Sequence, residues 1–226
     1  MPAPDGRLSV RPQAVLFDLD GTLVDSAPDL AAAANAMRVA RGMAPLDPGA
    51  YRAHCGSGAR GMLRVAFDMQ AGDPGYDACR EEYLSRYAEV LLQDSALFER
   101  IPQLLRALEA ARLPWGIVTN KSHALAAPLC QGLGLQPAVL VGGDTTAHRK
   151  PHPAPLMHAC LALAVSPRDC LYVGDDPRDI EAGRAAGMRT VGVRWGYLGL
   201  ERAIEHWGAD ALIDEPLQLL NCLKLA

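Results

Sequence analysis

Short apolar runs recur along the chain and are separated by stretches with helical spacing. The apolar runs lie at residues 15–17, 115–118, 139–141, 171–173, 191–193 and 211–213. They are continuous rather than alternating, as expected for parallel strands that helices cover on both faces. Between them, Pro102 begins a predicted helix that extends to Arg112, and Pro177 begins another that Gly187 ends. The order of these elements predicts an α/β fold with a doubly wound parallel sheet.

Residues 25–95 interrupt this alternation of strands and helices, because they contain no strand-like run. Their first helix is expected to begin after Ser26, which would be its N-terminal cap, with Asp29 three residues farther on. Later in the segment, apolar and aromatic side chains recur at four-residue steps, at Cys79, Tyr83, Tyr87 and Leu91. That spacing predicts an amphipathic helix, so the whole segment is expected to be helical.

This interruption predicts two domains. Residues 1–24 and 96–226 would form the α/β core, and residues 25–95 would form a helical cap inserted into it. Open α/β sheets bind their ligands at the carboxyl edge, so a cap over that edge would control access to a site. Hinges for its movement are expected near residues 24–25 and in the segment 95–100.

Composition and charge narrow the classes of partner. The chain has 226 residues, 50% of them hydrophobic, with a net charge of −4 and a pI near 5.8. This balance predicts no nucleic-acid partner and no membrane-surface partner. The six cysteines form no CxxC pair, residues 1–12 lack the apolar stretch of a signal peptide, and no segment is long enough to span a bilayer. Together these features predict a cytoplasmic protein.

Two aspartates, Asp18 and Asp20, follow the first apolar run directly. Because side chains along a strand alternate between its faces, the two carboxylates are expected to start on the same side of the chain. Crowded carboxylates repel each other unless a cation or a shared proton relieves them. The segment could also be a simple turn or part of a calcium-binding loop. A calcium loop, however, needs a preceding helix and a glutamate at its twelfth position, where this chain has Asp29.

Other polar clusters follow other predicted strands. Thr119 and Asn120 come after the second apolar run, Lys150 lies beyond the third, and Asp175 and Asp179 come after the fourth. Each of these residues alone could be an ordinary turn or surface residue. The carboxyl ends of parallel strands meet at one edge of a sheet, so together they are expected to surround the first two aspartates.

These clusters resemble, in order and context, the motifs of the haloacid dehalogenase superfamily of phosphatases. The family's first motif, DxDGT, is intact at residues 18–22, and its second, a hydroxyl residue at a strand end, is Thr119. Its third, a lysine followed by Pro-x-Pro, is Lys150, and its fourth, GDxxxD, stands at residues 174–179. The likeness covers nearly the whole chain. It implies a Rossmann-like core with a helical cap and a Mg²⁺-dependent phosphomonoester hydrolase.

The resemblance implies distinct roles for the carboxylates. Asp18 would be the nucleophile and form an aspartyl-phosphate, while Asp20 would protonate the leaving alcohol and then activate water. Asp18, the backbone carbonyl of Asp20 and Asp175 would hold Mg²⁺. Asp179 would orient metal-bound water or the motif lysine from outside the ligand set. The additional Asp176 would strengthen cation binding or lie farther out.

The remaining motif residues would bind the phosphoryl group. Thr119, the Asn120 amide and Lys150 would contact its oxygens, where charge must be stabilised during transfer. Gly21 would let backbone N–H groups approach the phosphate, because it has no side chain in the way. These residues are therefore expected to form the phosphate-binding part of the site.

A second glycine-rich segment lies in the predicted cap. Residues 56–61 match G-x-G-x-x-G, but no strand-like run precedes them, so a dinucleotide cofactor is not expected. The loop is instead expected to open a helix toward the site. Arg60 would then pair with a substrate carboxylate through its planar guanidinium, unless it is simply exposed.

Within the superfamily, the chain resembles the phosphoglycolate phosphatase group and a related group, the N-acetylmuramic acid 6-phosphate phosphatases of cell-wall recycling. The first group more often has serine where this chain has Asp176. Either resemblance implies a small acidic phosphate ester as substrate, and both esters carry a carboxylate. A sugar phosphomutase of the same fold and a non-catalytic binding module are the alternatives, whereas Asp20 argues against a dehalogenase.

Overall fold

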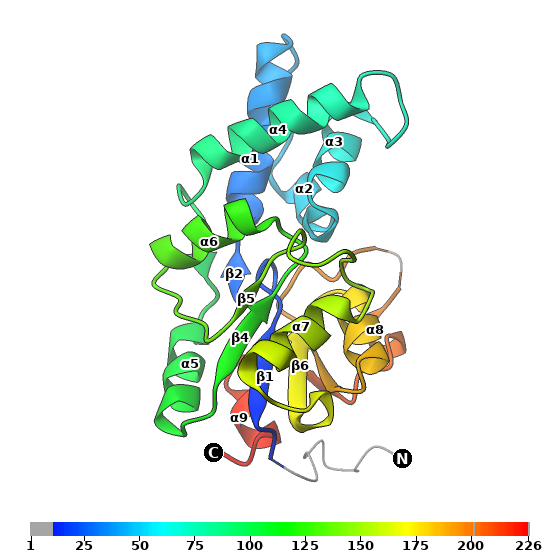
Figure 1. The fold of residues 1–226 in the computed structure, drawn as a ribbon. Coiled ribbons are helices and arrows are strands. Elements are labelled where there is room, and N and C mark those ends of the chain that lie inside the picture. Colours follow the sequence, from blue (N-terminus) through cyan, green and yellow to red (C-terminus); the bar gives the residue numbers. More distant parts are fainter. Residues whose placement is uncertain (1–10, 201, 226) are drawn as a thin grey trace.

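A six-stranded parallel sheet forms the centre of the larger part of the molecule (Figure 1). The computed structural model describes residues 11–200 and 202–225, so most of the segment 1–12, on which the expectation of no signal peptide rests, lies outside it. The strands lie in the spatial order β5–β4–β1–β6–β7–β8. Their bounds are β1 Ala14–Phe17, β4 Trp115–Val118, β5 Leu140–Val141, β6 Cys170–Gly174, β7 Arg189–Val193 and β8 Ala211–Ile213. Each predicted apolar run contains a strand, which confirms the predicted α/β fold.

Helices cover both faces of this sheet. Their bounds are α5 Ile101–Ala110, α6 His123–Gly132, α7 Ala154–Leu163, α8 Pro177–Ala185 and α9 Gln218–Cys222. Val15 and Phe17 of β1 share an apolar core with α5, α6 and α9, whereas Ala14 and Leu16 share another with α7 and α8. Because both faces of β1 are buried, its apolar run is continuous. Within the described residues, no helix has the length and apolar character that crossing a membrane requires.

Between β1 and β4 the chain leaves the sheet and forms a separate group of helices, which we call the helical insert. Its helices are α1 Ala27–Ala40, α2 Gly49–Arg52, α3 Ala59–Phe67 and α4 Tyr76–Val90, and 3₁₀ turns lie at Cys55–Ser57 here and at Pro167–Asp169 and Ile204–His206 in the α/β part. The insert has its own apolar core, in which Tyr83 and Tyr87 of α4 stack with ring centroids 6.3 Å apart. Figure 1 shows the insert over the end of the sheet toward which β1 and β4 run.

Two short strands connect the insert to the sheet. β2 (Val24–Asp25) and β3 (Ala96–Leu97) pair antiparallel. The two chain crossings, where the chain enters and leaves the insert, are therefore hydrogen-bonded to each other. The hinges were expected in these two segments. Both the hinges and the domain division at residues 25 and 95 stay predictions.

The start of α1 differs from expectation in its capping. Ser26 occupies the cap position as predicted, but its side chain makes no cap hydrogen bond. Instead, Ser26 Oγ donates to Asp20 Oδ1 at 2.5 Å. A capping serine accepts a backbone N–H of the first helical turn with its hydroxyl oxygen, and here the hydroxyl is instead directed toward the charged Asp20 carboxylate.

Asp29, in the first turn of α1, joins the two chain crossings. Its buried carboxylate accepts hydrogen bonds from the backbone N–H groups of Leu92, Asp94 and Ser95 at 3.1, 2.9 and 3.0 Å. The Ser95 hydroxyl also donates to it, at 2.6 Å. The N-terminal end of the α1 dipole favours the same negative charge. One carboxylate therefore holds the turn by which the chain returns to the sheet.

We expect Asp29→Ala to lower the free energy of unfolding by about 3 kcal/mol, because three backbone N–H groups lose a charged acceptor. Ser95→Ala removes only the hydroxyl bond and should cost about 1 kcal/mol. Urea unfolding followed by circular dichroism measures both losses. Equal losses in the two variants would contradict the role given to the carboxylate.

Candidate active site

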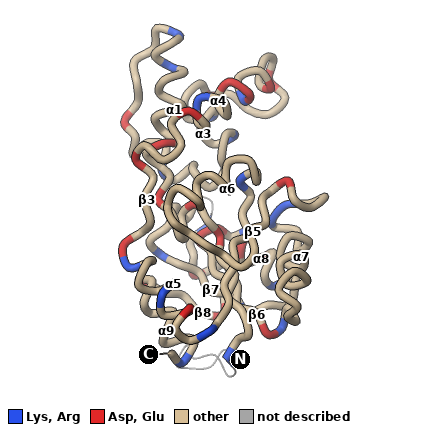
Figure 2. The backbone as a smooth tube through the Cα atoms, turned by 60° about the vertical axis from the view of Figure 1, so that its left-hand side comes forward, with Lys and Arg blue, Asp and Glu red and all other residues tan. Residues whose placement is uncertain are grey.

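Three carboxylates meet at the carboxyl edge of the sheet, beneath the helical insert. Asp18 follows β1, Asp175 follows β6, and Asp179 lies in the first turn of α8. One oxygen of each lies within 4.8 Å of the others. Figure 2, in which acidic positions are red, shows some of them inside the fold between the insert and the sheet. The structure thus brings together three of the predicted site residues, which we call the carboxylate cluster.

Burial and neighbouring negative charge disfavour the ionised form of two of these carboxylates, Asp175 and Asp179. Burial, followed by the charges of Asp18 and Asp179, raises the pKa of Asp175 well above its ordinary value. Burial also raises the pKa of Asp179, although Lys150 opposes the shift. Asp18 Oδ1 is buried and, within the part of the chain described, has no hydrogen-bond donor, although Lys150 Nζ forms an ion pair with it at 2.8 Å. A cation held by the cluster would reduce the repulsion between the carboxylates and would give Asp18 Oδ1 a binding partner.

Gly21 makes room for this cluster. A Cβ atom at this position would lie 2.2 Å from Asp175 Oδ2, and the residue has a φ of +84°. The Gly21 N–H donates to the carbonyl oxygen of Val24 at 2.8 Å, so it is already engaged within the chain. The contribution of Gly21 that the structure shows is therefore space for Asp175. The Asp175 carboxylate in turn accepts hydrogen bonds from the Thr22 hydroxyl and the Tyr197 N–H, both at 2.8 Å.

Lys150 brings a buried positive charge to the cluster. Its Nζ lies 2.7 Å from Asp179 Oδ1 and donates to the Tyr172 hydroxyl at 2.7 Å. Burial lowers the pKa of Lys150, but the charges of Asp179 and Asp18 raise it overall, so the ammonium stays charged. The side-chain amide of Asn120 holds the Lys150 main chain through two hydrogen bonds of 3.0 Å.

The loop after β4 supplies the predicted phosphate-binding groups. Thr119 is buried at the cavity wall, and its Oγ1 accepts the Lys121 N–H at 3.2 Å, which leaves the hydroxyl proton available to a ligand. The side-chain amide of Asn120 is engaged by Lys150, so a contact between Asn120 and a phosphoryl group would come from its backbone N–H.

Asp20 has a different set of partners. Its Oδ1 accepts the Ser26 hydroxyl and lies 3.1 Å from Lys121 Nζ. Lys121 is also buried and donates to the hydroxyl of Tyr87, on α4 of the insert, at 2.8 Å. Burial lowers the pKa of Lys121, whereas Asp20 and Tyr87 raise it overall. A chain of polar contacts therefore joins Asp20 to Ser26 at the start of α1 and to α4 of the insert.

Sequence reasoning missed Lys121, Tyr87 and Tyr197 as site residues. The only signal for Lys121 is its place two residues after Thr119 in the same loop. Tyr87 was expected only as part of the apolar face of a helix. Tyr197, whose hydroxyl accepts the Ser26 N–H at 2.8 Å, carries no local signal of this role.

A cavity of about 870 Å³ separates the carboxylate cluster from the insert. The core lines it with residues that include Asp18 and Lys150, and the insert lines it with residues 56–60 and Arg80 among others. The loop 56–58 includes the end of the 3₁₀ turn Cys55–Ser57 and leads into α3, so it opens a helix beside the site as predicted, and the described element directly before the turn is α2. Arg60 is exposed on the cavity wall.

Asp176 lies at the N-terminal cap of α8 rather than in the carboxylate cluster. Its Oδ1 accepts the Arg178 N–H at 2.9 Å, and its Oδ2 pairs with Arg178 Nη2 at 2.6 Å. Asp179 Oδ2 accepts the Asp176 N–H at 3.1 Å, which completes a capping box. The structure therefore places Asp176 against Arg178.

Comparison with known proteins gives results that agree with this geometry. The family model for haloacid dehalogenase-like hydrolases matches residues 12–187. The N-acetylmuramic acid 6-phosphate phosphatase of Pseudomonas aeruginosa is 44% identical over 219 residues, which cover 96% of this chain and 97% of that protein. The phosphoglycolate phosphatase of Xanthomonas campestris pv. campestris is 47% identical over 211 residues, which cover 92% of this chain and 95% of that protein.

A solved structure supports the same relationship. The crystal structure of a predicted phosphoglycolate phosphatase from Haemophilus somnus 129pt has a TM-score of 0.83 and 27% sequence identity. The match covers 95% of this chain and 99% of that one. The chain therefore belongs to the haloacid dehalogenase-like hydrolase family.

Proposed function

We propose that this protein is a Mg²⁺-dependent phosphatase that hydrolyses a phosphate monoester through an aspartyl-phosphate on Asp18. The observation that carries the proposal is the place of the Asp18 carboxylate. It lies at the end of the central strand, beside the Lys150 ammonium and within a carboxylate cluster that needs a further cation. The two relatives named above are both called phosphatases, which supports the same reaction class.

The carboxylate cluster suits a magnesium ion. Mg²⁺ prefers oxygen ligands and is usually held by one or two carboxylates together with waters and phosphate oxygens. Asp18, Asp175 and the backbone carbonyl of Asp20 would hold it, while Asp179 would keep Lys150 in place from the edge of the cluster. When bound, the ion supplies positive charge against the phosphoryl oxygens.

The two neighbouring aspartates would divide the chemistry between them. An oxygen of Asp18 attacks phosphorus, and the bond between phosphorus and the substrate oxygen breaks. Asp20 gives its proton to that oxygen, which departs as an alcohol. Asp20 then takes a proton from water as the water oxygen attacks phosphorus, the bond to Asp18 breaks, and inorganic phosphate leaves. Ser26 and Lys121 hold the Asp20 carboxylate in position for both steps.

The phosphoryl group would be held by donors that converge on Asp18. The Thr119 hydroxyl, the Asn120 backbone N–H and the Lys150 ammonium would contact its oxygens, where negative charge must be stabilised during transfer. Because the Lys150 ammonium is held by a buried hydrogen bond to Tyr172 and its main chain by Asn120, this donor needs little reorganisation when the substrate arrives.

The cavity favours the larger of the two candidate substrates. At about 870 Å³ it lies toward the upper end of the range for small-molecule sites, far more than a two-carbon acid needs. We therefore propose a phosphorylated sugar acid of the N-acetylmuramic acid 6-phosphate type, whose carboxylate Arg60 would bind with its planar guanidinium.

Substitution of the two aspartates should separate their roles. Asp18→Asn removes the nucleophile and should leave phosphate release at the level of buffer alone. Asp20→Asn removes only acid–base help and should lower kcat by about 10² to 10⁴-fold. Release of phosphate from N-acetylmuramic acid 6-phosphate in Mg²⁺ measures both, with circular dichroism to show that each variant is folded. Wild-type turnover by Asp18→Asn would overturn the proposed function.

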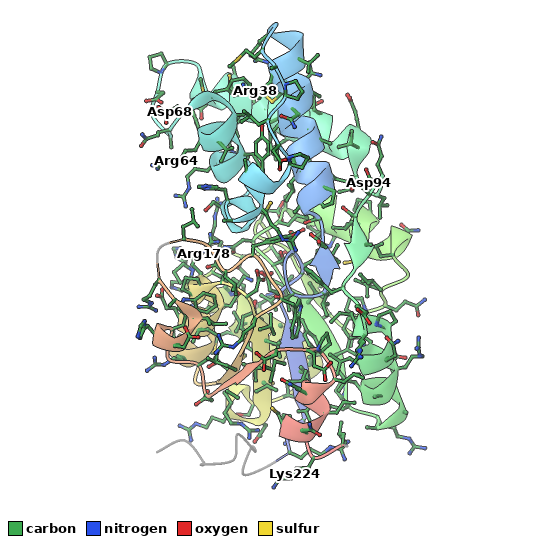
Figure 3. The ribbon with its side chains drawn as sticks, turned by 180° about the vertical axis from the view of Figure 1, so that it is seen from behind. Arg38, Arg64, Asp68, Asp94, Arg178 and Lys224 are labelled. Carbon is green, nitrogen blue, oxygen red and sulfur yellow. The ribbon has the colours of Figure 1, made fainter. Side chains whose placement is uncertain are left out.

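A second assay tests the choice of substrate. The wild-type enzyme should hydrolyse N-acetylmuramic acid 6-phosphate with a higher kcat/KM than 2-phosphoglycolate. Arg60→Ala should raise KM for the sugar acid by about 10 to 100-fold, because a charge-assisted hydrogen bond is lost. Arg64→Ala is the matched control, since Arg64 is exposed on the same helix and lies outside the cavity lining (Figure 3). A preference for 2-phosphoglycolate, or equal KM values in the two variants, would contradict the substrate assignment.

A further inference from the structure

Arg178 joins the α/β core to the helical insert at the edge of the cavity. Its Nε donates to Asp176 Oδ1 at 2.7 Å, and its Nη2 lies 2.6 Å from Asp176 Oδ2. The same Nη2 donates to the backbone carbonyl oxygen of Gly56, in the insert. Figure 3 shows Arg178 at the boundary between the two parts of the molecule. One guanidinium therefore holds a carboxylate of the core and a loop of the insert at once.

Arg178 and Gly56 can approach each other closely for two reasons. The bidentate pairing with Asp176 fixes the plane of the guanidinium. The direction in which Nη2 donates to the insert is therefore also fixed. Gly56 leaves the space that this requires, because a Cβ there would lie 3.0 Å from Asp176 Oδ2 and 3.5 Å from Arg178 Nη2. The side chains of Asp176 and Arg178 are 17% and 29% exposed, so water competes only partly with the pairing.

The loop that Arg178 holds leads directly to Arg60. Residues 56–58 line the cavity, and α3 begins at Ala59, so Arg60 lies in its first turn. A shift of the Gly56 carbonyl would therefore move the wall of the cavity and the base of Arg60 together.

We propose that Asp176 and Arg178 are positioning residues that hold the loop 56–58 over the phosphoryl site and thereby set which substrates the enzyme accepts. This inference rests on the proposed function for its effect on substrates, but not for the contact itself. It gives a reason for the aspartate at position 176. Serine at this position could still cap α8 but could not pair with both nitrogens of the guanidinium.

Hydrogen exchange of the full-length protein without substrate tests the contact directly. Arg178→Ala and Asp176→Ser should each speed amide exchange in the peptide that covers residues 54–61 by about tenfold or more, because the loop loses its tie to the core. Exchange in the peptide that covers β1 should stay at the wild-type rate, which shows that the sheet is intact. Arg184→Ala, at the far end of α8 and exposed, is the matched control and should leave the loop unchanged.

Kinetics test the consequence for the substrate. Each variant should raise KM for N-acetylmuramic acid 6-phosphate by about tenfold, while KM for p-nitrophenyl phosphate, which has no carboxylate for Arg60, should rise less than threefold. Because the two residues act as one unit, the double variant should be no worse than either single variant. Arg178→Lys keeps the charge without the planar pairing and should behave as Arg178→Ala does.

The two readouts separate the possible failures. Unchanged exchange in residues 54–61 of Arg178→Ala and Asp176→Ser would overturn the positioning role, even if the wild-type enzyme is an active phosphatase. Equal changes of KM for the two esters, or an effect confined to kcat, would overturn the link to substrate choice. Faster loop exchange in a protein that hydrolyses neither ester would support the contact and contradict the proposed function instead.

Discussion

The arrangement of this molecule depends on negative charge confined at one edge of a parallel sheet. Asp18, Asp175 and Asp179 approach one another where the sheet ends, and Lys150 is the buried cation against them. One ammonium faces three carboxylates, and burial together with the charges of Asp18 and Asp179 raises the pKa of Asp175 well above its ordinary value. A phosphoryl group would add still more negative charge. The proposed bound cation would allow the site to hold a phosphate ester and its own carboxylates together.

The helical insert completes a site that the sheet alone leaves open. Contacts across the boundary run from Tyr87 to Lys121 and from Gly56 to Arg178, and the cavity lies between the two parts. Each contact reaches a residue next to a carboxylate of the proposed active site, because Lys121 pairs with Asp20 and Arg178 stands in the first turn of the helix that carries Asp179. The position of the insert and the arrangement of the site are thus linked through a few polar groups.

Much of this could be predicted from the sequence, for physical reasons. Continuous apolar runs are what strands buried on both faces require, and the topology of a parallel sheet brings the residues after those strands to one edge. The carboxylate cluster follows from that topology. Residues 56–61 likewise lead into a helix beside the site, as predicted.

What could not be predicted depends on partners that are distant in the sequence. Ser26 stands at the cap position of α1, yet its hydroxyl donates to the charged Asp20 carboxylate and accepts no backbone N–H of the first helical turn. Lys121 and Arg178 look like ordinary loop and helix cations, and only the packing of the insert against the core reveals what they bind. Spacing along a chain encodes the faces of elements, but it does not encode which polar side chains meet across two elements.

The most direct measurement is rapid-quench mass spectrometry of the protein during turnover of N-acetylmuramic acid 6-phosphate in Mg²⁺. The account predicts a phosphate adduct on the peptide that contains Asp18, located on that side chain. Turnover that proceeds without any adduct on this peptide, or with the adduct on another residue, would contradict the account.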